Sequence, residues 1–193
     1  MNLELILVLF YSYLLGSVPF GLLLTKIFLK KDIRNVGSGN IGTTNVLRTG
    51  KKSLALATLI FDILKGYVSI VITLKYYNDL IYFSALICFI GHIFPIWLKF
   101  KGGKGVATYV GIILALSFKF GIIFGTTWLL VSFIFRYSSL ASMLSTLIVF
   151  VYSLILDNFT LSVYLFITFI IILYTHRENI VRLKDSKETK IEL

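Results

Sequence analysis

The chain has 193 residues, of which 58% are hydrophobic and 15% are charged, and its mean hydropathy is +0.91. Soluble domains carry about 45–50% apolar and about 25% charged residues, so this composition excludes a soluble globular domain and indicates an integral membrane protein. The formal net charge of +10 fits nucleic acid, an anionic lipid surface or an anionic substrate as a partner. In a membrane protein such a charge first of all fits lipid head groups, and we expect no nucleic-acid partner.

Seven apolar segments follow one another along the chain. They lie at residues 3–24, 54–74, 80–98, 106–118, 120–135, 139–156 and 159–175. A helix needs about 20 residues to cross a hydrocarbon core of about 30 Å, so the fourth and fifth segments are short. Fusing these two segments into one helix over 106–135 would give six spans instead of seven.

The distribution of Lys and Arg decides between seven and six spans. With seven spans and the N-terminus outside, sixteen of the nineteen basic residues fall on the cytoplasmic side, whereas Lys75 and Lys119 lie outside and Lys65 lies within a span. Six spans would move Arg136 to the other side and leave the basic tail outside. We therefore expect an all-α, polytopic membrane protein with seven transmembrane helices, an outside N-terminus and a cytoplasmic C-terminus.

The chain shows no internal repeat, and its polar parts are loops between the apolar segments. Its start, Met1–Glu4, has no basic residue, which indicates a retained first helix rather than a secretory signal peptide. We expect a single domain over residues 1–193. Its cytoplasmic parts are predicted to be the loops at about 25–53, 99–105 and 136–138 and the tail at 176–193.

A glycine-rich string precedes the second apolar segment: Arg34–Asn45 reads RNVGSGNIGTTN, and Arg48 follows it. Three glycines in six residues, with Ser, Thr and Asn between them, let backbone N–H groups curl around an anion. Gly37 and Gly42 stand five apart as in a P-loop, but Thr43 takes the place of the lysine, so we expect no nucleoside-triphosphate site. The alternative interpretation is a flexible loop between helices.

A second glycine-rich string, Lys101–Gly105, reads KGGKG and lies directly before the fourth apolar segment. Lysines flanked by glycines bring both an ammonium group and bare backbone to a phosphate. The same lysines would also suit the phosphates of lipid head groups, which lysine side chains reach from the end of a span. The string by itself leaves both interpretations open.

The third polar string, His176–Arg182, follows the last apolar segment and reads HRENIVR. If the last helix continues into it, His176 and Asn179 share one face, while Arg177 points elsewhere. The alternative is a boundary marker, since a His-Arg pair is common where a helix leaves the membrane.

Two ionisable residues lie within the second apolar segment. Asp62 and Lys65 are three residues apart, so they can neutralise each other, either as an ion pair that braces the helices or as part of the catalytic machinery. His92 lies four residues after Cys88, but no further sulfur and no His-carboxylate cluster accompanies the pair. We therefore expect no metal site.

Several catalytic motifs are absent from the sequence. It contains no G-x-S-x-G nucleophile elbow, no H-E-x-x-H helix and no His-x4-Asp pattern of the kind common in thioester-dependent acyltransferases. The polar strings are rich in cations and amide donors and poor in general bases. This composition favours chemistry that binds anions and uses an already activated donor.

Together, these strings resemble the bacterial acyl-phosphate:glycerol-3-phosphate acyltransferases, the PlsY family. The resemblance extends from about residue 11 to residue 182, nearly the whole chain. The segments that carry it are Gly16–Gly21, Asp32–Arg34, Gly37–Asn45, Asp62–Gly66, Gly91 and His92 with Pro95, Phe100–Thr108, Ser139 with Ser142, and His176–Asn179.

The resemblance implies a multi-pass enzyme of the bacterial cytoplasmic (inner) membrane with its active site at the cytoplasmic face. It would transfer a fatty acyl group from acyl phosphate, not from acyl-CoA or acyl-carrier protein, to glycerol 3-phosphate. The products would be 1-acyl-glycerol 3-phosphate (lysophosphatidic acid) and phosphate, the first step of bacterial phospholipid synthesis. No metal or organic cofactor is implied. Besides the two substrates, we expect membrane lipids as partners. We expect the protein to be a monomer.

The site residues implied by the resemblance fall into two groups. The first group would hold a phosphate and its neighbouring carbonyl or neutralise charge on the leaving phosphate: Ser38, Gly39, Asn40, Thr44, Asn45, Arg48, Lys101, Gly103 and Lys104. The second group would hold glycerol 3-phosphate: Ser142, His176, Arg177 and Asn179. Among these, Lys104, His176 and Asn179 are the expected catalytic residues, and we expect a substrate phosphate oxygen to take the proton of the attacking hydroxyl.

An anion transporter or channel for phosphate esters is the main alternative. Its polar residues should line a path to the far side of the membrane. That side offers little beyond Glu4, Lys75, Asp79, Lys119 and Asp157, so no continuous charged path is evident. A lipid-binding scaffold is a third interpretation, but it would not need two glycine-rich anion loops.

Overall fold

A computed structural model describes residues 3–156 and 158–191, and all regular elements in these two ranges are helices. The predicted all-α class is therefore confirmed. The helices group into two compact units, Met1–Leu116 and Ser117–Leu193. Each unit is described by itself below, and the single domain over 1–193 stays a prediction.

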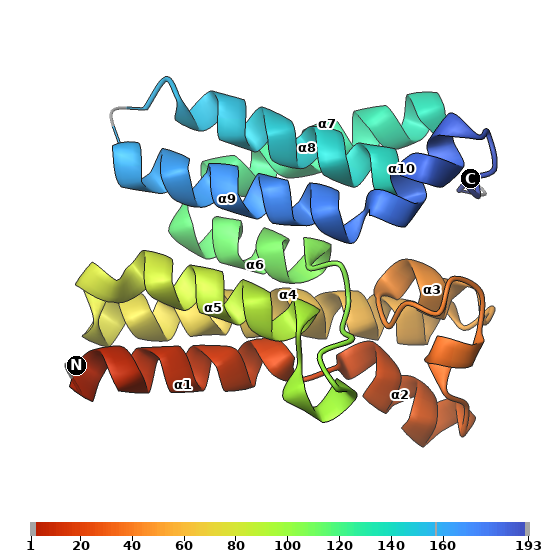
Figure 1. Cartoon of the computed structure of the whole chain (residues 1–193), viewed down its shortest axis with the longest axis horizontal. Coiled ribbons are helices and arrows are strands. Elements are labelled where there is room, and N and C mark those ends of the chain that lie inside the picture. Colours follow the sequence, from red (N-terminus) through yellow and green to blue (C-terminus); the bar gives the residue numbers. More distant parts are fainter. Residues whose placement is uncertain (1–2, 157, 192–193) are drawn as a thin grey trace. The chain divides into compact units, whose positions relative to one another are not determined.

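The N-terminal unit contains six α-helices and three short 3₁₀ turns in its described part (Figure 1). Helix α4 packs against α1, α2, α3, α5 and α6, and α1 also packs along α5. The α-helices are α1 (Leu3–Ser17), α2 (Phe20–Leu29), α3 (Thr43–Leu47), α4 (Lys52–Tyr76), α5 (Ile81–Ile93) and α6 (Val106–Leu116). The 3₁₀ turns are η1 (Ile33–Asn35), η2 (Asn78–Leu80) and η3 (Ile96–Leu98).

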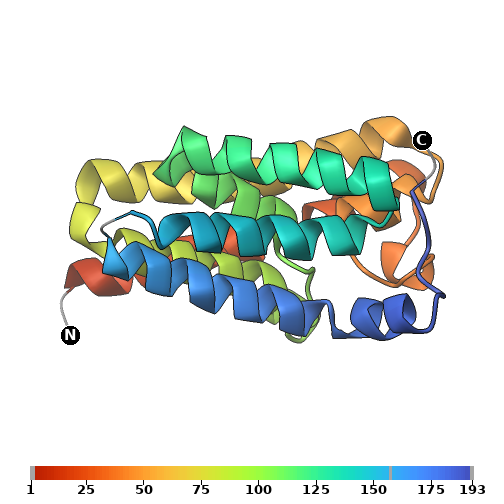
Figure 2. The same cartoon turned by 90° about the horizontal axis from the view of Figure 1, so that it is seen from above.

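The C-terminal unit contains the remaining four helices. These are α7 (Phe118–Phe135), α8 (Ser138–Ser153), α9 (Phe159–Thr175) and α10 (Arg177–Lys184). Helix α8 packs between α7 and α9, as Figure 2 shows. Helix α10 is bent by 60° from α9, so the predicted continuation of the last helix is broken at His176. The bend lies where the apolar sequence of α9 gives way to the polar residues of α10.

In the part of the chain that the structure describes, four helical segments are long and apolar enough to cross a membrane: Leu3–Leu29, Lys52–Tyr76, Asn78–Leu98 and Phe118–Phe135. The bent pair α9 and α10 makes a fifth if it counts as one span. Helices α6 and α8 are apolar but have 11 and 16 residues, fewer than the roughly 20 that a straight crossing requires. The fold is thus that of a helical membrane protein with four or five full-length spans by this measure.

The first span is interrupted between α1 and α2, where the sequence predicted one uninterrupted segment. Pro19 has no N–H to donate within a helix, and it frees carbonyl groups of the preceding turn. The carbonyl of Val18 accepts a hydrogen bond from Nζ of Lys65 at 2.8 Å, and that of Ser17 accepts one from Nε1 of Trp97 at 3.1 Å. The break is therefore held by side chains from α4 and η3.

Glycines let the helices of the N-terminal unit approach backbone to backbone. A Cβ on Gly16 of α1 would overlap the carbonyl of Cys88 in α5, and a Cβ on Gly111 of α6 would overlap the carbonyl of Ile63 in α4. Close contact through small residues is a common way for helices to associate in a membrane, where burial from water supplies no driving force. These contacts fix the positions of α5 against α1 and of α6 against α4. The Lys101–Gly105 loop lies in the segment that connects α5 to α6.

Candidate active site

The glycine-rich loop between η1 and α3 is organised around the buried side chain of Asn45. Its Nδ2 lies 2.9 Å from the carbonyl oxygen of Val36 and 2.7 Å from that of Asn40, and its Oδ1 accepts a hydrogen bond from the backbone N–H of Ser38 at 3.0 Å. Its amide is engaged within the loop. Asn45 therefore shapes the loop in this structure, and its predicted contact with substrate stays a prediction.

The same loop turns outward at Gly37 and Gly39, whose φ angles of 56° and 70° are in the left-handed region that favours glycine. Between them, Ser38 is exposed, and so are Thr44 and Arg48 further along. A Cβ on Gly37 would approach Cδ of Arg48 to 2.9 Å, so the arginine lies against the loop. The outward side of the loop thus carries hydroxyl and guanidinium donors together.

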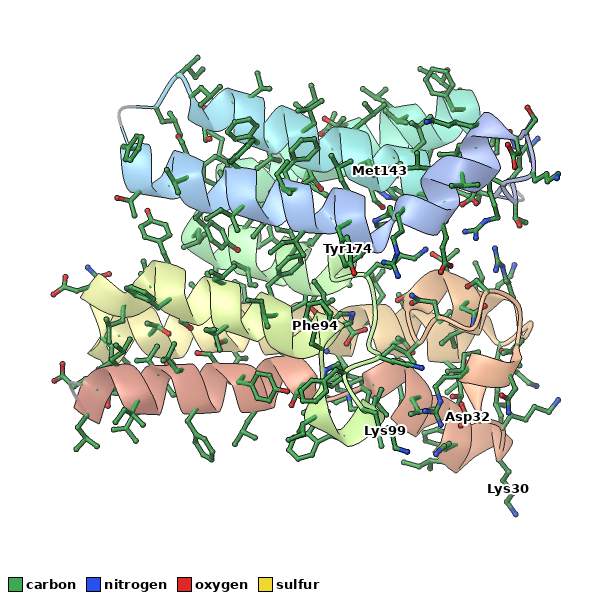
Figure 3. All side chains as sticks on the ribbon, in the orientation of Figure 1. Lys30, Asp32, Phe94, Lys99, Met143 and Tyr174 are labelled. Atoms are coloured by element: carbon green, nitrogen blue, oxygen red, sulfur yellow. The ribbon has the colours of Figure 1, made fainter. Side chains whose placement is uncertain are left out.

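An ion pair fixes the entrance of this loop. Asp32 accepts hydrogen bonds from the Arg34 side chain at 2.9 and 2.6 Å and caps η1 by accepting from its backbone N–H at 3.0 Å. The side-chain hydrogen bond from Arg34 is the main reason that the pKa of Asp32 falls to about 2. Figure 3 shows Asp32 near Lys30, at the end of α2.

The Lys101–Gly105 loop is hydrogen-bonded to the C-terminal end of α5. The N–H of Gly102 donates to the carbonyl of Ile93 at 2.9 Å, and the N–H of Gly103 donates to the carbonyl of His92 at 3.1 Å. These carbonyls belong to the last turn of a helix, which has no internal partners for them. Gly103 and Gly105 are buried, Lys104 is half-buried and Lys101 is exposed. The loop is therefore held to the helix end by its backbone.

One hydrophobic cluster in the N-terminal unit contacts both the glycine-rich loop and η3, the turn that precedes the Lys101–Gly105 loop. Ile33 and Val46 are fully buried in it, and they flank the glycine-rich loop. Leu98, two residues before Phe100, packs against the same cluster. The structure thus brings the two predicted anion-binding strings to one part of the N-terminal unit.

Beneath the second loop lies a buried polar cluster made of Asp62, Lys65 and His92. Nζ of Lys65 is 2.7 Å from Oδ1 of Asp62 and 2.8 Å from Nδ1 of His92. The predicted ion pair is therefore present. His92, which we considered as a metal ligand and as one of the residues that carry the family resemblance, contacts Lys65 of this pair. Within 3–156 and 158–191, no three His, Cys, Asp or Glu residues come together as a metal site.

In the C-terminal unit, His176 ends α9 and its side chain is buried. Its Nδ1 lies 2.8 Å from the carbonyl oxygen of Ile172, and because a carbonyl only accepts, Nδ1 carries the hydrogen. In a neutral imidazole, Nε2 is then the nitrogen that can accept a proton. Arg177 beside it is exposed, with its guanidinium 4.6 Å from the centre of the Tyr174 ring.

Asn179 lies in a network that the sequence analysis missed. Its Nδ2 donates to Oε1 of Glu188 at 2.6 Å, and the same carboxylate accepts from Oγ of Ser139 at 2.8 Å and from Nε of Arg182 at 2.7 Å. Partial burial raises the pKa of Glu188, but the hydrogen bonds from Asn179, Arg182 and Ser139 outweigh it, so the pKa lies below its usual value. Glu188 stands in a polar tail with no hydrophobic periodicity, which left no signal in the sequence.

Ser142 of α8 points into its own unit. Its hydroxyl donates to the carbonyl of Ser138 at 2.8 Å and accepts from Nε1 of Trp128 at 3.2 Å. The side chain is 3% exposed. In this arrangement, Ser142 joins α7 to α8, and its predicted contact with glycerol 3-phosphate stays a prediction.

The apolar helices and the loops of N–H, hydroxyl and cationic donors are typical of a membrane enzyme that acts on phosphate-bearing molecules. Residues 6–186 match the family described as glycerol-3-phosphate acyltransferase. The chain belongs to this family and is an integral membrane acyltransferase.

Relatives and solved structures agree with this assignment. The chain is 51% identical to a glycerol-3-phosphate acyltransferase of Pelagibacter ubique, covering 99% of this chain and 100% of the relative. It is 47% identical to one of Mesorhizobium japonicum, over 99% and 98%. The crystal structure of PlsY, an integral membrane glycerol 3-phosphate acyltransferase in its glycerol 3-phosphate form, matches with a TM-score of 0.93 and 34% identity. That match covers 98% of this chain and 96% of PlsY, and the lysophosphatidic acid form matches with a TM-score of 0.90.

The Glu188 network predicts a pH-dependent contribution to stability. Glu188→Gln removes the charge and should lower the Tm at pH 7 by a few degrees, as expected for a loss of about 1–2 kcal/mol. Because the folded-state pKa lies below the ordinary value of 4.5, the carboxylate stabilises the fold above that pH and loses this effect as the pH falls through the folded-state pKa. The Tm difference between wild type and Glu188→Gln should therefore shrink in acid.

Thermal unfolding in detergent from pH 7 down to pH 3 measures this difference. Glu178→Gln is the matched control, since Glu178 is exposed in the first turn of α10, and its Tm should follow that of wild type. A Tm difference for Glu188→Gln that stays constant with pH would contradict the prediction.

Proposed function

We propose that the chain transfers a fatty acyl group from acyl phosphate to the 1-hydroxyl of glycerol 3-phosphate. The hydroxyl oxygen attacks the acyl carbon, the bond from that carbon to the phosphate oxygen breaks, and the products are 1-acyl-glycerol 3-phosphate and inorganic phosphate. This is the first step of bacterial phospholipid synthesis. Family membership supports the acceptor, and the composition of the loops supports the activated donor.

One observation carries the proposal: the glycine-rich loop packs on the same hydrophobic cluster as Leu98 of η3, the turn that leads into the Lys101–Gly105 loop, and neither loop presents a Ser or Cys nucleophile paired with a base. An acyl phosphate is a mixed anhydride with a good leaving group, so no covalent enzyme intermediate is required. Catalysis then depends on binding the phosphates and stabilising charge as the leaving group departs.

The residues have the following proposed roles. In the N-terminal unit, Lys104 and Arg48 neutralise charge on the leaving phosphate, and Asn45 keeps the glycine-rich loop in shape. The groups that cradle the phosphate and the acyl carbonyl are Ser38, Gly39, Asn40, Thr44, Lys101 and Gly103. In the C-terminal unit, the groups that bind glycerol 3-phosphate are Ser142, His176, Arg177 and Asn179.

We further propose that the protein is a monomer with seven membrane spans in the bacterial cytoplasmic (inner) membrane, with the N-terminus outside and both glycine-rich loops on the cytoplasmic side. The support is the placement of sixteen of nineteen Lys and Arg residues on one side. Helices α6 and α8 are then short spans, which a locally thinned bilayer accommodates.

Donor choice is the first prediction of this proposal. Purified protein given palmitoyl phosphate and glycerol 3-phosphate should release phosphate, and palmitoyl-CoA should give no product. Lys104→Ala should lower kcat/KM by about 10²–10³-fold, the loss expected for one group that stabilises transition-state charge. The exposed Lys31→Ala is the control and should retain wild-type activity.

Turnover with the CoA thioester would contradict the donor assignment. If both donors are silent in folded protein, the acyltransferase proposal fails, and flux of phosphate esters into liposomes becomes the test of a transporter.

The proton acceptor gives the second prediction. If a substrate phosphate oxygen takes the proton, His176→Ala should raise the KM for glycerol 3-phosphate and leave measurable kcat at saturation. His176→Asn, whose amide can still donate to the Ile172 carbonyl, controls for disruption of the helix end. Loss of all turnover at saturating glycerol 3-phosphate, across the pH-rate profile, would instead identify His176 as the base.

Topology gives the third prediction. The native thiol, Cys88, is fully buried, so single exposed cysteines report their side of the membrane. With seven spans, Asp79→Cys should react with an impermeant maleimide in intact cells, and Lys187→Cys only after permeabilisation. Labelling of Lys187→Cys in intact cells would favour six spans.

A further inference from the structure

The buried ammonium group of Lys65 connects three segments of the N-terminal unit. It lies 2.7 Å from the carboxylate of Asp62 in α4, 2.8 Å from the carbonyl of Val18 at the α1–α2 break, and 2.8 Å from Nδ1 of His92 in α5. The ammonium group donates hydrogen bonds to the Val18 carbonyl and to Nδ1 of His92, and it forms an ion pair with the Asp62 carboxylate. The Lys65 and Asp62 side chains are each 3% exposed.

The contact with Lys65 fixes which nitrogen of His92 carries the hydrogen. An ammonium group cannot accept a hydrogen bond, so Nδ1 of His92 is the acceptor, and in the neutral ring Nε2 carries the hydrogen. The imidazole is therefore held at one edge by Lys65, and its opposite edge, with Nε2, faces away from the ion pair.

That opposite edge lies against the Lys101–Gly105 loop. A Cβ on Gly103 would overlap Nε2 of His92, so the backbone of Gly103 packs directly against the imidazole ring. The same residue also holds the loop through its main chain, since its carbonyl accepts from the N–H of Gly103 at 3.1 Å. Lys104 is the next residue along the chain. The orientation of the His92 ring therefore affects where the backbone of Lys104 lies relative to the end of α5.

We propose that Lys65 and His92 are positioning residues for the acyl-transfer reaction: Lys65, neutralised by Asp62, orients the His92 ring, and the ring fixes the backbone at Gly103 and so the start of Lys104. The inference rests on the proposed role of Lys104. The buried pair would then affect the reaction rate as well as the packing of the helices. A displacement of about 1 Å in a catalytic group such as Lys104 can lower the rate about 10²-fold.

The first experiment separates positioning from folding. Lys65→Met alone leaves the Asp62 charge buried without its partner and should lower the Tm strongly. The double variant Asp62→Leu with Lys65→Met removes both charges, and apolar replacement of a buried ion pair is often neutral for stability. We expect its Tm to recover most of the loss, though not all of it because the Val18 carbonyl still lacks its Lys65 donor, while kcat/KM with palmitoyl phosphate stays about 10–100-fold low because His92 has also lost its donor.

The second experiment tests the two edges of the ring separately. In His92→Asn, the amide oxygen can accept a hydrogen bond near the wild-type position of Nδ1, but no atom occupies the position of Nε2. In His92→Gln, the longer side chain extends toward the position of Nε2. We expect His92→Asn to keep its Tm and to tolerate Gly103→Ala, whose Cβ then has room. In the wild-type background and in His92→Gln, Gly103→Ala should lower kcat/KM by at least tenfold more.

Hydrogen exchange of the peptide spanning 99–106 gives a readout that does not depend on activity. Exchange at the Gly102 and Gly103 amides should be faster in the double variant and in His92→Asn than in wild type, with exchange in α8 unchanged. Faster exchange together with full activity of Lys104→Ala would uphold the loop support and overturn the proposed role of Lys104.

Two results would overturn the positioning role itself. One is a folded double variant whose hydrogen exchange in 99–106 and whose kcat/KM both equal those of wild type. This result would show that the cluster only stabilises the helix packing. The other is an equal effect of Gly103→Ala in the wild-type, His92→Asn and His92→Gln backgrounds, which would show that the imidazole does not support the loop.

Discussion

A backbone group that is buried away from water, whether in the bilayer or inside the protein, must find its hydrogen-bond partner within the protein itself. In the N-terminal unit this constraint determines how the loops are held. At the α1–α2 break, Lys65 and Trp97 donate to the freed carbonyls. At the end of α5, the amides of Gly102 and Gly103 do the same. The loop that carries Lys104 is thus also the cap of a helix.

The same constraint explains why glycine recurs next to the proposed phosphate donors. A loop that satisfies helix carbonyls through its own N–H groups must lie flat on the helix end, and at Gly103 a side chain would meet the imidazole of His92. In the glycine-rich loop, Asn45 performs an equivalent task by binding the backbone from inside. Both loops keep their inner side for internal hydrogen bonds, and their outer side can carry donors for an anion.

In the C-terminal unit, a charged side chain joins other side chains and does not satisfy freed backbone groups. Glu188 returns from the tail to accept from Ser139 of α8 and from Asn179 and Arg182 of α10. An acidic residue is thus paired with the donors next to His176. Because these contacts keep the carboxylate ionised, the tail that follows α10 contributes to the geometry of Asn179, a proposed substrate-binding residue.

Composition, apolar segments and polar strings were sufficient to predict an all-α membrane protein of this acyltransferase family, since hydrophobic length and local motifs are properties of consecutive residues. The sequence also predicted the Asp62–Lys65 pair, because both residues lie within one helical turn. It did not predict that His92, 27 residues away from Lys65, completes the cluster, that Asn45 faces into its loop, or that Glu188 meets Asn179. These contacts join residues from different elements, and only the packing of the helices decides which of them meet.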